Sequence, residues 1–153
     1  MFFYTFFALL LLGAFFCIYQ ISVADFRRRI IPDVYLFPLF LIGLVLAHFF
    51  PWICSTGESV IGAVVGYALA SIVGFAFEKY NPNKFDTPIG MGDIKLLAVG
   101  GWWLGTTGLA IALVFTCIFG MIWGRHNKQK FIPFAPFFFL GGFLSFITIL
   151  FLI

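Results

Sequence analysis

Long apolar segments separated by short polar ones dominate the pattern of this chain. The apolar runs carry hydrophobic residues on every face, whereas strands of a membrane barrel alternate apolar and polar positions. About 20 apolar residues in a helix cross a hydrocarbon core of roughly 30 Å. The pattern therefore predicts an all-α membrane protein, a bundle of six transmembrane helices over about residues 2–24, 34–50, 57–77, 91–105, 109–123 and 131–153.

Composition supports this fold class. The 153 residues are 63% hydrophobic and only 10% charged, whereas about a quarter of a soluble domain is charged. Six spans use up the length, so residues 1–153 are predicted to form a single transmembrane domain. The first apolar run lacks a basic segment before it and a small-residue cleavage site after it, so it is expected to be a retained span and not a signal peptide.

Proline, glycine and polar residues mark the predicted ends of the helices. Pro32 cannot continue the first helix, and Asp33 after it is predicted to be the N-cap of the second. Short connections are predicted at Pro51–Thr56 and at Gly105–Gly108, and the longest polar loop at Glu78–Ile89. Whether that long loop controls access to a site is left open by the sequence.

The third predicted helix carries a ridge of small residues. Gly62, Gly66, Ala70 and Gly74 recur at every fourth position, and such ridges let two helices approach closely in lipid. Packing against another helix of the same chain and packing in a homodimer both remain open.

The basic residues predict an orientation in the membrane. With six alternating spans, all of them fall on one side: Arg27, Arg28, Arg29, Lys79, Lys84, Lys95, Arg125, Lys128 and Lys130. Lysine and arginine in short loops mark the cytoplasmic side, so both termini are predicted to lie on the outer side. Two acids, Asp25 and Asp93, are then placed at similar depth on the cytoplasmic face.

These two acids offer a specific chemistry. Asp25 ends the first apolar run, and Asp93 lies in the segment Gly90–Lys95, of sequence GMGDIK, which opens the fourth. Acids near membrane helices are costly and usually face the protein interior. Two close carboxyl groups share a proton, so one can take a proton from water while the other polarises a carbonyl, as in aspartic proteases. The glycines at 90 and 92 would leave room for a substrate backbone.

The chain resembles the type IV prepilin peptidases, membrane aspartic proteases with a Gly-x-Gly-Asp motif. The similar elements are Asp25 with Pro32, Asp33 and Pro38 downstream, the segment Gly90–Leu96, and the segment Ile132–Phe137 before the last span. The resemblance implies that Asp25 and Asp93 are the catalytic pair, with Gly90, Met91, Gly92, Lys95 and Asp33 as substrate-binding or supporting residues.

The resemblance also implies a substrate and a location. Prepilins and pilin-like proteins with a short basic leader, ending in glycine and followed by an apolar helix, would be cut at the cytoplasmic surface of the bacterial inner membrane. Longer family members carry an N-terminal cytoplasmic region with paired Cys-x-x-Cys motifs and also methylate the product. This chain starts at its first span, which argues against methyl transfer and favours a short, peptidase-only member.

Other functions are weighed against this one. A small proton-coupled carrier could use the same acids as a proton relay, although no inverted repeat and no acid near the middle of a span supports it. A purely structural assembly subunit would tolerate loss of both acids. The dispersed cysteines and the two histidines form no metal-ligand set, so no metal or other cofactor is expected. Membrane lipid is an expected partner and nucleic acid is not, because no basic stripe with interleaved aromatic residues occurs.

Overall fold

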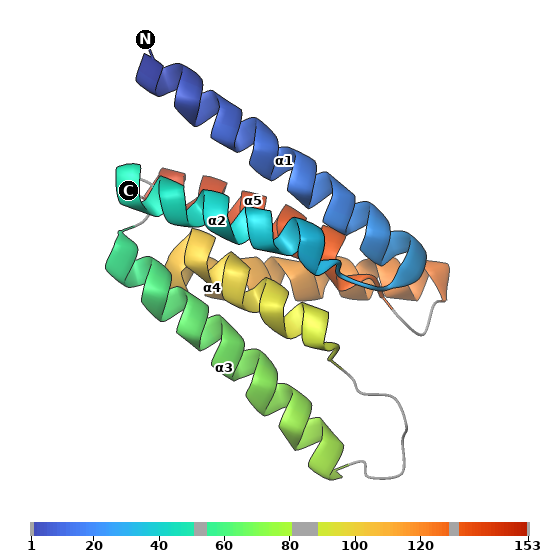
Figure 1. Cartoon of the computed structure of the whole chain (residues 1–153). Helices are drawn as coiled ribbons and strands as arrows, with labels where there is room; N and C mark the ends of the chain where they lie inside the picture. Colours follow the sequence, from blue (N-terminus) through green and yellow to red (C-terminus); the bar gives the residue numbers. More distant parts are fainter. Residues whose placement is uncertain (1, 51–54, 81–88, 129–131, 153) are drawn as a thin grey trace.

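A computed structural model describes residues 2–50, 55–80, 89–128 and 132–152. In these ranges the chain forms helices α1 (Phe2–Arg28), α2 (Asp33–Phe49), α3 (Thr56–Tyr80), α4 (Met91–Asn127) and α5 (Phe134–Leu152), and it contains no strand there (Figure 1). Four of the five helices are long and apolar enough to cross a membrane, and α2, with 17 residues, is shorter. The predicted all-helical class is confirmed.

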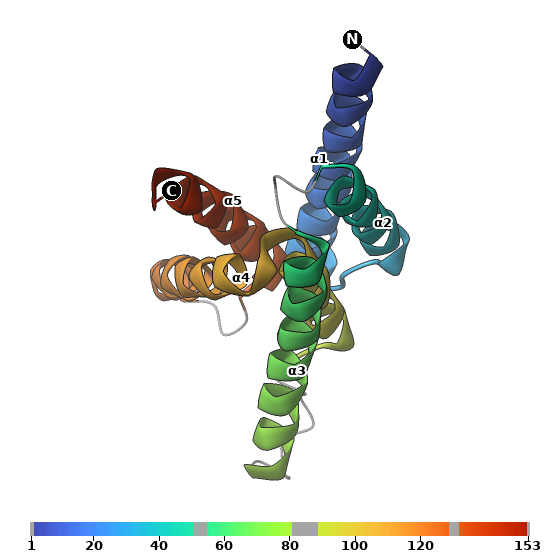
Figure 2. The same cartoon turned by 90° about the vertical axis from the view of Figure 1, so that its left-hand side faces the viewer.

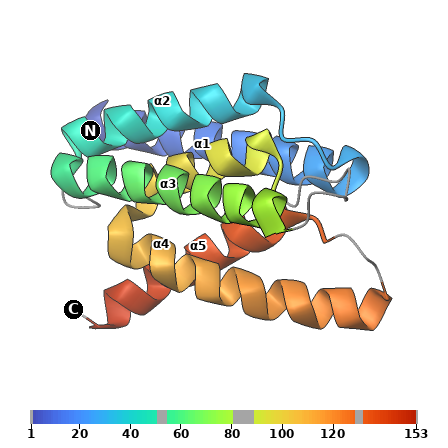
Figure 3. The same ribbon diagram turned by 90° about the horizontal axis from the view of Figure 1, so that it is seen from below.

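The largest difference from the sequence prediction lies in α4. Residues 91–127 form one assigned helix, but Gly105 in its middle has φ 68° and ψ −176°. This left-handed φ favours glycine, which has no Cβ to clash. Figures 1 and 3 show that the chain reverses direction at this break, so both ends of α4 lie at the same end of the bundle. The connection predicted at Gly105–Gly108 is too long, because residues 106–108 are already helical.

The two halves of α4 have different neighbours. α3 packs along residues 91–104: a Cβ built on Gly62 would meet the carbonyl oxygen of Gly101, and one on Gly66 would meet that of Leu97. α5 packs along the second half, where Gly141 lies against the carbonyl oxygen of Ala112. Figure 2, turned by 90° from Figure 1, shows three groups of helices that extend from the centre in different directions: α3 alone, α4 with α5, and α1 with α2.

The small-residue ridge of α3 is used within the chain. Gly62, Gly66 and Ala70 are buried, whereas Gly74 has nothing within 4 Å of the position a Cβ would take. Backbones that meet this closely gain packing that larger side chains would prevent. The ridge therefore joins α3 to α4, and a homodimer stays an untested prediction.

A tryptophan fixes α2 on the same half of α4. The indole Nε1 of Trp103 donates a hydrogen bond to the carbonyl oxygen of Leu39 at 3.1 Å. The ring lies against Gly43, where a Cβ would overlap it. The deepest apolar side chains, among them Ile21, Leu96 and Phe138, fill the space between α1, α4 and α5.

Several predicted boundaries shift. α1 continues to Arg28, so Asp25 lies inside its last turn, and α3 continues to Tyr80, so Glu78 is helical and not in a loop. Asp33 is the first residue of α2, and the N-cap is Pro32, so the predicted capping role of Asp33 is wrong. Outside the described residues lie positions 51–54, 81–88 and 129–131, with most of the predicted loops and the predicted start of the last span.

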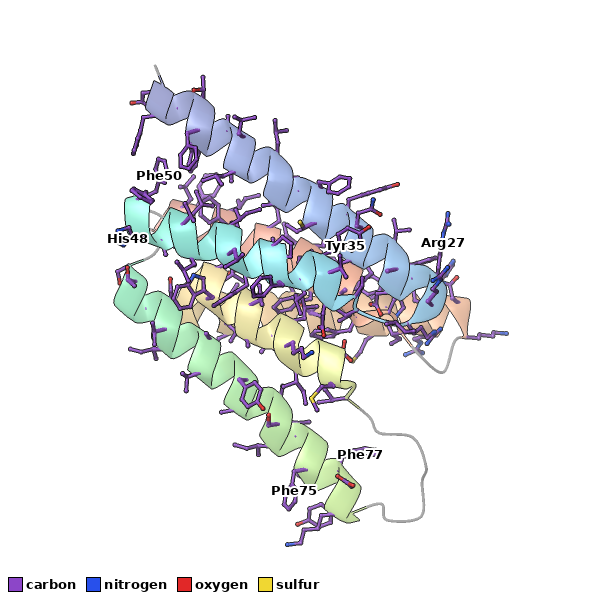
Figure 4. All side chains as sticks on the ribbon, viewed as in Figure 1. Arg27, Tyr35, His48, Phe50, Phe75 and Phe77 are labelled. Atoms are coloured by element: carbon purple, nitrogen blue, oxygen red, sulfur yellow. The ribbon has the colours of Figure 1, made fainter. Side chains whose placement is uncertain are left out.

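The two ends of the bundle differ in charge. One side of the molecule, on the right in Figures 1 and 3, holds the C-terminal ends of α1 and α3, both ends of α4 and the N-terminal ends of α2 and α5. The end of α3 lies apart from the others on this side. All basic residues that the structure describes are at or near these ends. In Figure 4, Arg27 is at this end, and His48 and Phe50 are at the opposite one. On the far half of α3, Phe75 and Phe77 are exposed.

Candidate active site

Asp25 is a carboxylate buried at the basic end of the bundle. It lies in the last turn of α1, and only 5% of the residue is exposed. Its Oδ2 accepts a hydrogen bond from the backbone N–H of Ala135 at 2.8 Å, and the N–H of Phe134 also faces it. Phe134 and Ala135 are the first two residues of α5, whose N–H groups have no partner inside the helix. Asp25 therefore caps α5 from another helix, where the helix dipole favours a negative charge.

The start of α5 has the composition that such a contact requires. Pro133 is buried and precedes the helix, and Pro136 lies in its first turn, where a missing N–H costs nothing. Ala135 is fully buried and has a side chain small enough to let the carboxylate reach the backbone. Sequence reasoning singled out this segment only by resemblance and did not connect it to Asp25, which lies 110 residues away.

Asp93 is held by its own helix start. It is the third residue of α4, after the N-cap Gly90, and its Oδ2 accepts a hydrogen bond from the N–H of Gly90 at 3.3 Å. In return the N–H of Asp93 donates to the carbonyl oxygen of Gly90 at 3.0 Å. The residue is half-buried. This pair of bonds fixes the direction of the carboxyl group in the first turn of α4.

The fold brings the two acids together. Asp25 is in the last turn of α1 and Asp93 is in the first turn of α4, two helix ends at the same end of the bundle, and the two acids are near enough for their charges to interact. One carboxyl is anchored by α5 and the other by the N-cap of α4, so their positions depend on three helices. Two carboxyl groups that are close to each other can share one proton.

The glycines around Met91 have different surroundings. A Cβ on Gly92 would lie 2.9 Å from the Cβ of Ile31, a buried residue between α1 and α2. A Cβ on Gly90 would lie 3.5 Å from the carboxylate of Asp93, an ordinary contact, and Met91 is 69% exposed. Gly92 thus has a packing reason to be glycine, which the sequence did not reveal.

We expect Gly92→Ala to lower stability more than Gly90→Ala, which loses only the preference of an N-cap for glycine over alanine. The new methyl group at position 92 must displace either Ile31 or the start of α4, which costs about 1–3 kcal/mol. The free energy of unfolding of the two variants, measured in the same detergent, checks this. Equal stability of both variants would contradict the assigned contact with Ile31.

Lys95 and Asp33 form an ion pair on another face of α4. Lys95 Nζ lies 2.6 Å from Asp33 Oδ2, and this contact joins the second turn of α4 to the first residue of α2. Two positions along a helix turn a side chain by roughly 200°, so Lys95 points away from the side of Asp93. The sequence did not pair these residues, although opposite charges at two helix starts on one membrane side were the available signal.

Comparison with known proteins gives a consistent result. A family model described as the type IV leader peptidase family matches residues 9–125. Proteins named prepilin leader peptidase/N-methyltransferase are 31% identical over 132 residues in Aeromonas hydrophila, 33% over 126 residues in Dichelobacter nodosus and 28% over 145 residues in Pseudomonas putida. These matches cover 82%, 80% and 90% of this chain, but only 44%, 43% and 49% of the relatives. The chain thus spans about half the length of the curated relatives it matches, and no solved structure matches it.

Proposed function

Because this chain belongs to the type IV leader peptidase family, we propose that it is an aspartic endopeptidase that removes the leader from prepilins and pilin-like proteins. The observation that carries the proposal is the pair Asp25 and Asp93. These two acids come from helices far apart in the sequence and interact at one end of an apolar bundle. Buried acids in such a bundle are costly, and a catalytic role accounts for their presence.

The proposed mechanism uses one water and one shared proton. The ionised carboxyl takes a proton from the water while the water oxygen attacks the scissile carbonyl carbon. The protonated carboxyl gives its proton to the carbonyl oxygen. The tetrahedral intermediate then collapses: the carboxyl that took the water proton gives it to the leaving nitrogen as the C–N bond breaks, and the other carboxylate takes back the proton of a diol hydroxyl as the new carboxyl group forms. The pair again holds one proton. Oδ2 of Asp25 is bound by α5, so its Oδ1 is the oxygen that we assign to the reaction.

The supporting groups have positioning roles in this scheme. The N–H of Ala135 orients Asp25, and the N–H of Gly90 orients Asp93. Such preorganisation matters because catalytic groups lose efficiency when they are misplaced by about 1 Å. Met91, exposed beside Asp93, is the residue that we assign to contact with an extended substrate.

We further propose that the chain crosses the membrane six times, with the dyad at the cytoplasmic surface of the bacterial inner membrane and both termini outside. The reversal at Gly105 supports this number, because it divides α4 into two halves that run in opposite directions. The gathering of described basic residues at the end that holds the dyad supports the orientation. The substrate would present its leader at that surface and keep its apolar helix in the membrane.

A cleavage assay tests the proposed function. Purified protein in lipid vesicles is incubated with a prepilin that carries a basic leader ending in glycine, and the new N-terminus of the product is sequenced. We expect a single cut directly after that glycine. Proton flux through the vesicles without any cleavage would instead support the carrier function. The proposal covers hydrolysis alone, because it depends on two carboxyl groups that perform acid–base chemistry.

A further inference from the structure

An apolar groove of about 780 Å³ lies between α2 and α3, with the first half of α4 as its floor. Its walls are formed by side chains such as Leu36, Phe40 and Val64, and Ala98 and Val99 line the floor. The groove is separate from the acid pair, because Asp93 is not among its lining residues.

The charged groups of the groove lie at its basic end, and Tyr67 on the α3 wall adds one hydroxyl group. Among its lining residues the charged ones are Asp33 and Lys95, which form the ion pair between α2 and α4. The α2 wall runs over the eight residues from Asp33 to Phe40, a rise of about 10 Å. Half of a hydrocarbon core measures about 15 Å. In the proposed orientation, the groove therefore extends from the membrane surface through most of one leaflet and no further.

These dimensions do not suit a membrane-spanning helix. Along its length of about 10 Å the groove could contact about two turns of a helix, whereas a span has more than five. The groove can instead cover part of the acyl chains of one lipid, whose charged head then lies beside the ion pair. The volume also falls in the range of about 300–1,000 Å³ found for small-molecule sites.

The ion pair narrows the choice of lipid. Side chains of Lys95 and Asp33 remain 46% and 64% exposed. An ammonium group has three donors and a carboxylate about four acceptor sites, so one mutual contact leaves both groups able to bind a ligand. A head group with a phosphate next to a primary ammonium group complements this pair, because each of its charges meets the opposite one.

We propose that the groove binds one phospholipid of the phosphatidylethanolamine type, with its phosphate on Lys95, its ammonium group on Asp33 and its acyl chains along α2, α3 and α4. A choline head group has no N–H to donate to Asp33. A glycerol head group has no cation and places a net negative charge beside the carboxylate. Lys95 and Asp33 are also residues that the family resemblance implies to support the peptidase, and the bound lipid bridges the two helices that their ion pair joins.

Native mass spectrometry of the full chain tests the proposal. The protein is released from vesicles made of equal parts of phosphatidylethanolamine, phosphatidylcholine and phosphatidylglycerol, and the retained lipids are counted. We expect wild type to retain one phosphatidylethanolamine in preference to the other two lipids. Asp33→Asn removes a charge-assisted hydrogen bond, so the preference over phosphatidylcholine falls roughly tenfold.

Further variants separate the groove from the surface charge. Ala98→Phe fills the floor, and Ala68→Phe fills the α3 wall. Each is expected to lower retention of all three lipids while the ion pair stays intact. Arg125→Gln removes a charge outside the groove at the same end of the bundle and should change nothing.

Wild-type lipid retention by Asp33→Asn and by both phenylalanine variants would overturn the proposal. It would also be overturned if the phenylalanine variants kept their lipid but converted a dimer to a monomer, because the groove would then be an interface between copies. Lipid counts are read without any cleavage, so failure of the proposed peptidase activity would leave this result unaffected.

Discussion

An Asp93→Asn variant is expected to lose leader cleavage by about 10²–10⁴-fold while it remains folded in the membrane. Asparagine keeps an oxygen that can accept the hydrogen bond from the N–H of Gly90, so the first turn of α4 is preserved. It can neither take a proton from water nor give one to a carbonyl oxygen, and a positioned acid–base group contributes a factor of this size. The initial rate of prepilin cleavage, compared at equal protein concentration, measures the effect.

Two variants of Asp25 separate its proposed catalytic role from its structural contact with α5. Asp25→Asn and Asp25→Ala should both be as inactive as Asp93→Asn. Only the alanine variant leaves the buried N–H of Ala135 without an acceptor, which costs about 1–3 kcal/mol of stability. Normal cleavage by any of these variants would show that the two acids are not the catalytic pair.

Gly62→Ala is expected to separate α3 from α4 and to lower the free energy of unfolding by about 3 kcal/mol. The added methyl group would overlap the carbonyl oxygen of Gly101 and would lie 2.9 Å from the Cα of Gly105. These are backbone atoms of the other helix, so no side chain can rotate to make room. The free energy of unfolding is measured in mixed detergent, with the loss of the helical circular-dichroism signal as the readout.

Gly74→Ala on the same helix is the control for this prediction. Nothing lies within 4 Å of its added methyl group, and alanine favours a helix by up to about 1 kcal/mol over glycine. The variant should therefore be as stable as wild type or slightly more stable. If Gly62→Ala behaved in the same way, the close contact between α3 and α4 would be wrong.

The sequence was sufficient for the helical class, and it also predicted that the two acids lie at one end of the bundle. Apolar runs in lipid must satisfy their own backbone hydrogen bonds, which makes helices of them irrespective of their neighbours. The number of predicted spans and the positions of the basic residues then assigned Asp25 and Asp93 to one side of the membrane. In the structure, the ends of α1 and α4 that carry these acids lie at the same end of the bundle. The resemblance based on the Gly-x-Gly-Asp segment is confirmed by the family match.

The contacts that hold the acids could not be predicted, because they are tertiary. Nothing local in the residues around Asp25 indicates that it caps α5, since the donors come from a helix that follows much later in the chain. The contact between Gly92 and Ile31 and the ion pair between Lys95 and Asp33 likewise depend on how α4 meets the turn before α2. The glycine pattern at Gly105 did signal an interruption, but only the backbone angles show that one residue is enough for it.

Binding of a transition-state analogue tests the central claim most directly, that Asp25 and Asp93 act together on one water. The probe is a leader peptide in which a hydroxyl-bearing carbon replaces the scissile carbonyl, so that its hydroxyl group takes the place of the attacking water. Transition-state analogues bind at least about 10²-fold more tightly than substrates. We predict that Asp25→Asn and Asp93→Asn each abolish this advantage over the unmodified leader peptide. Undiminished tight binding of the analogue by either variant would contradict a shared site.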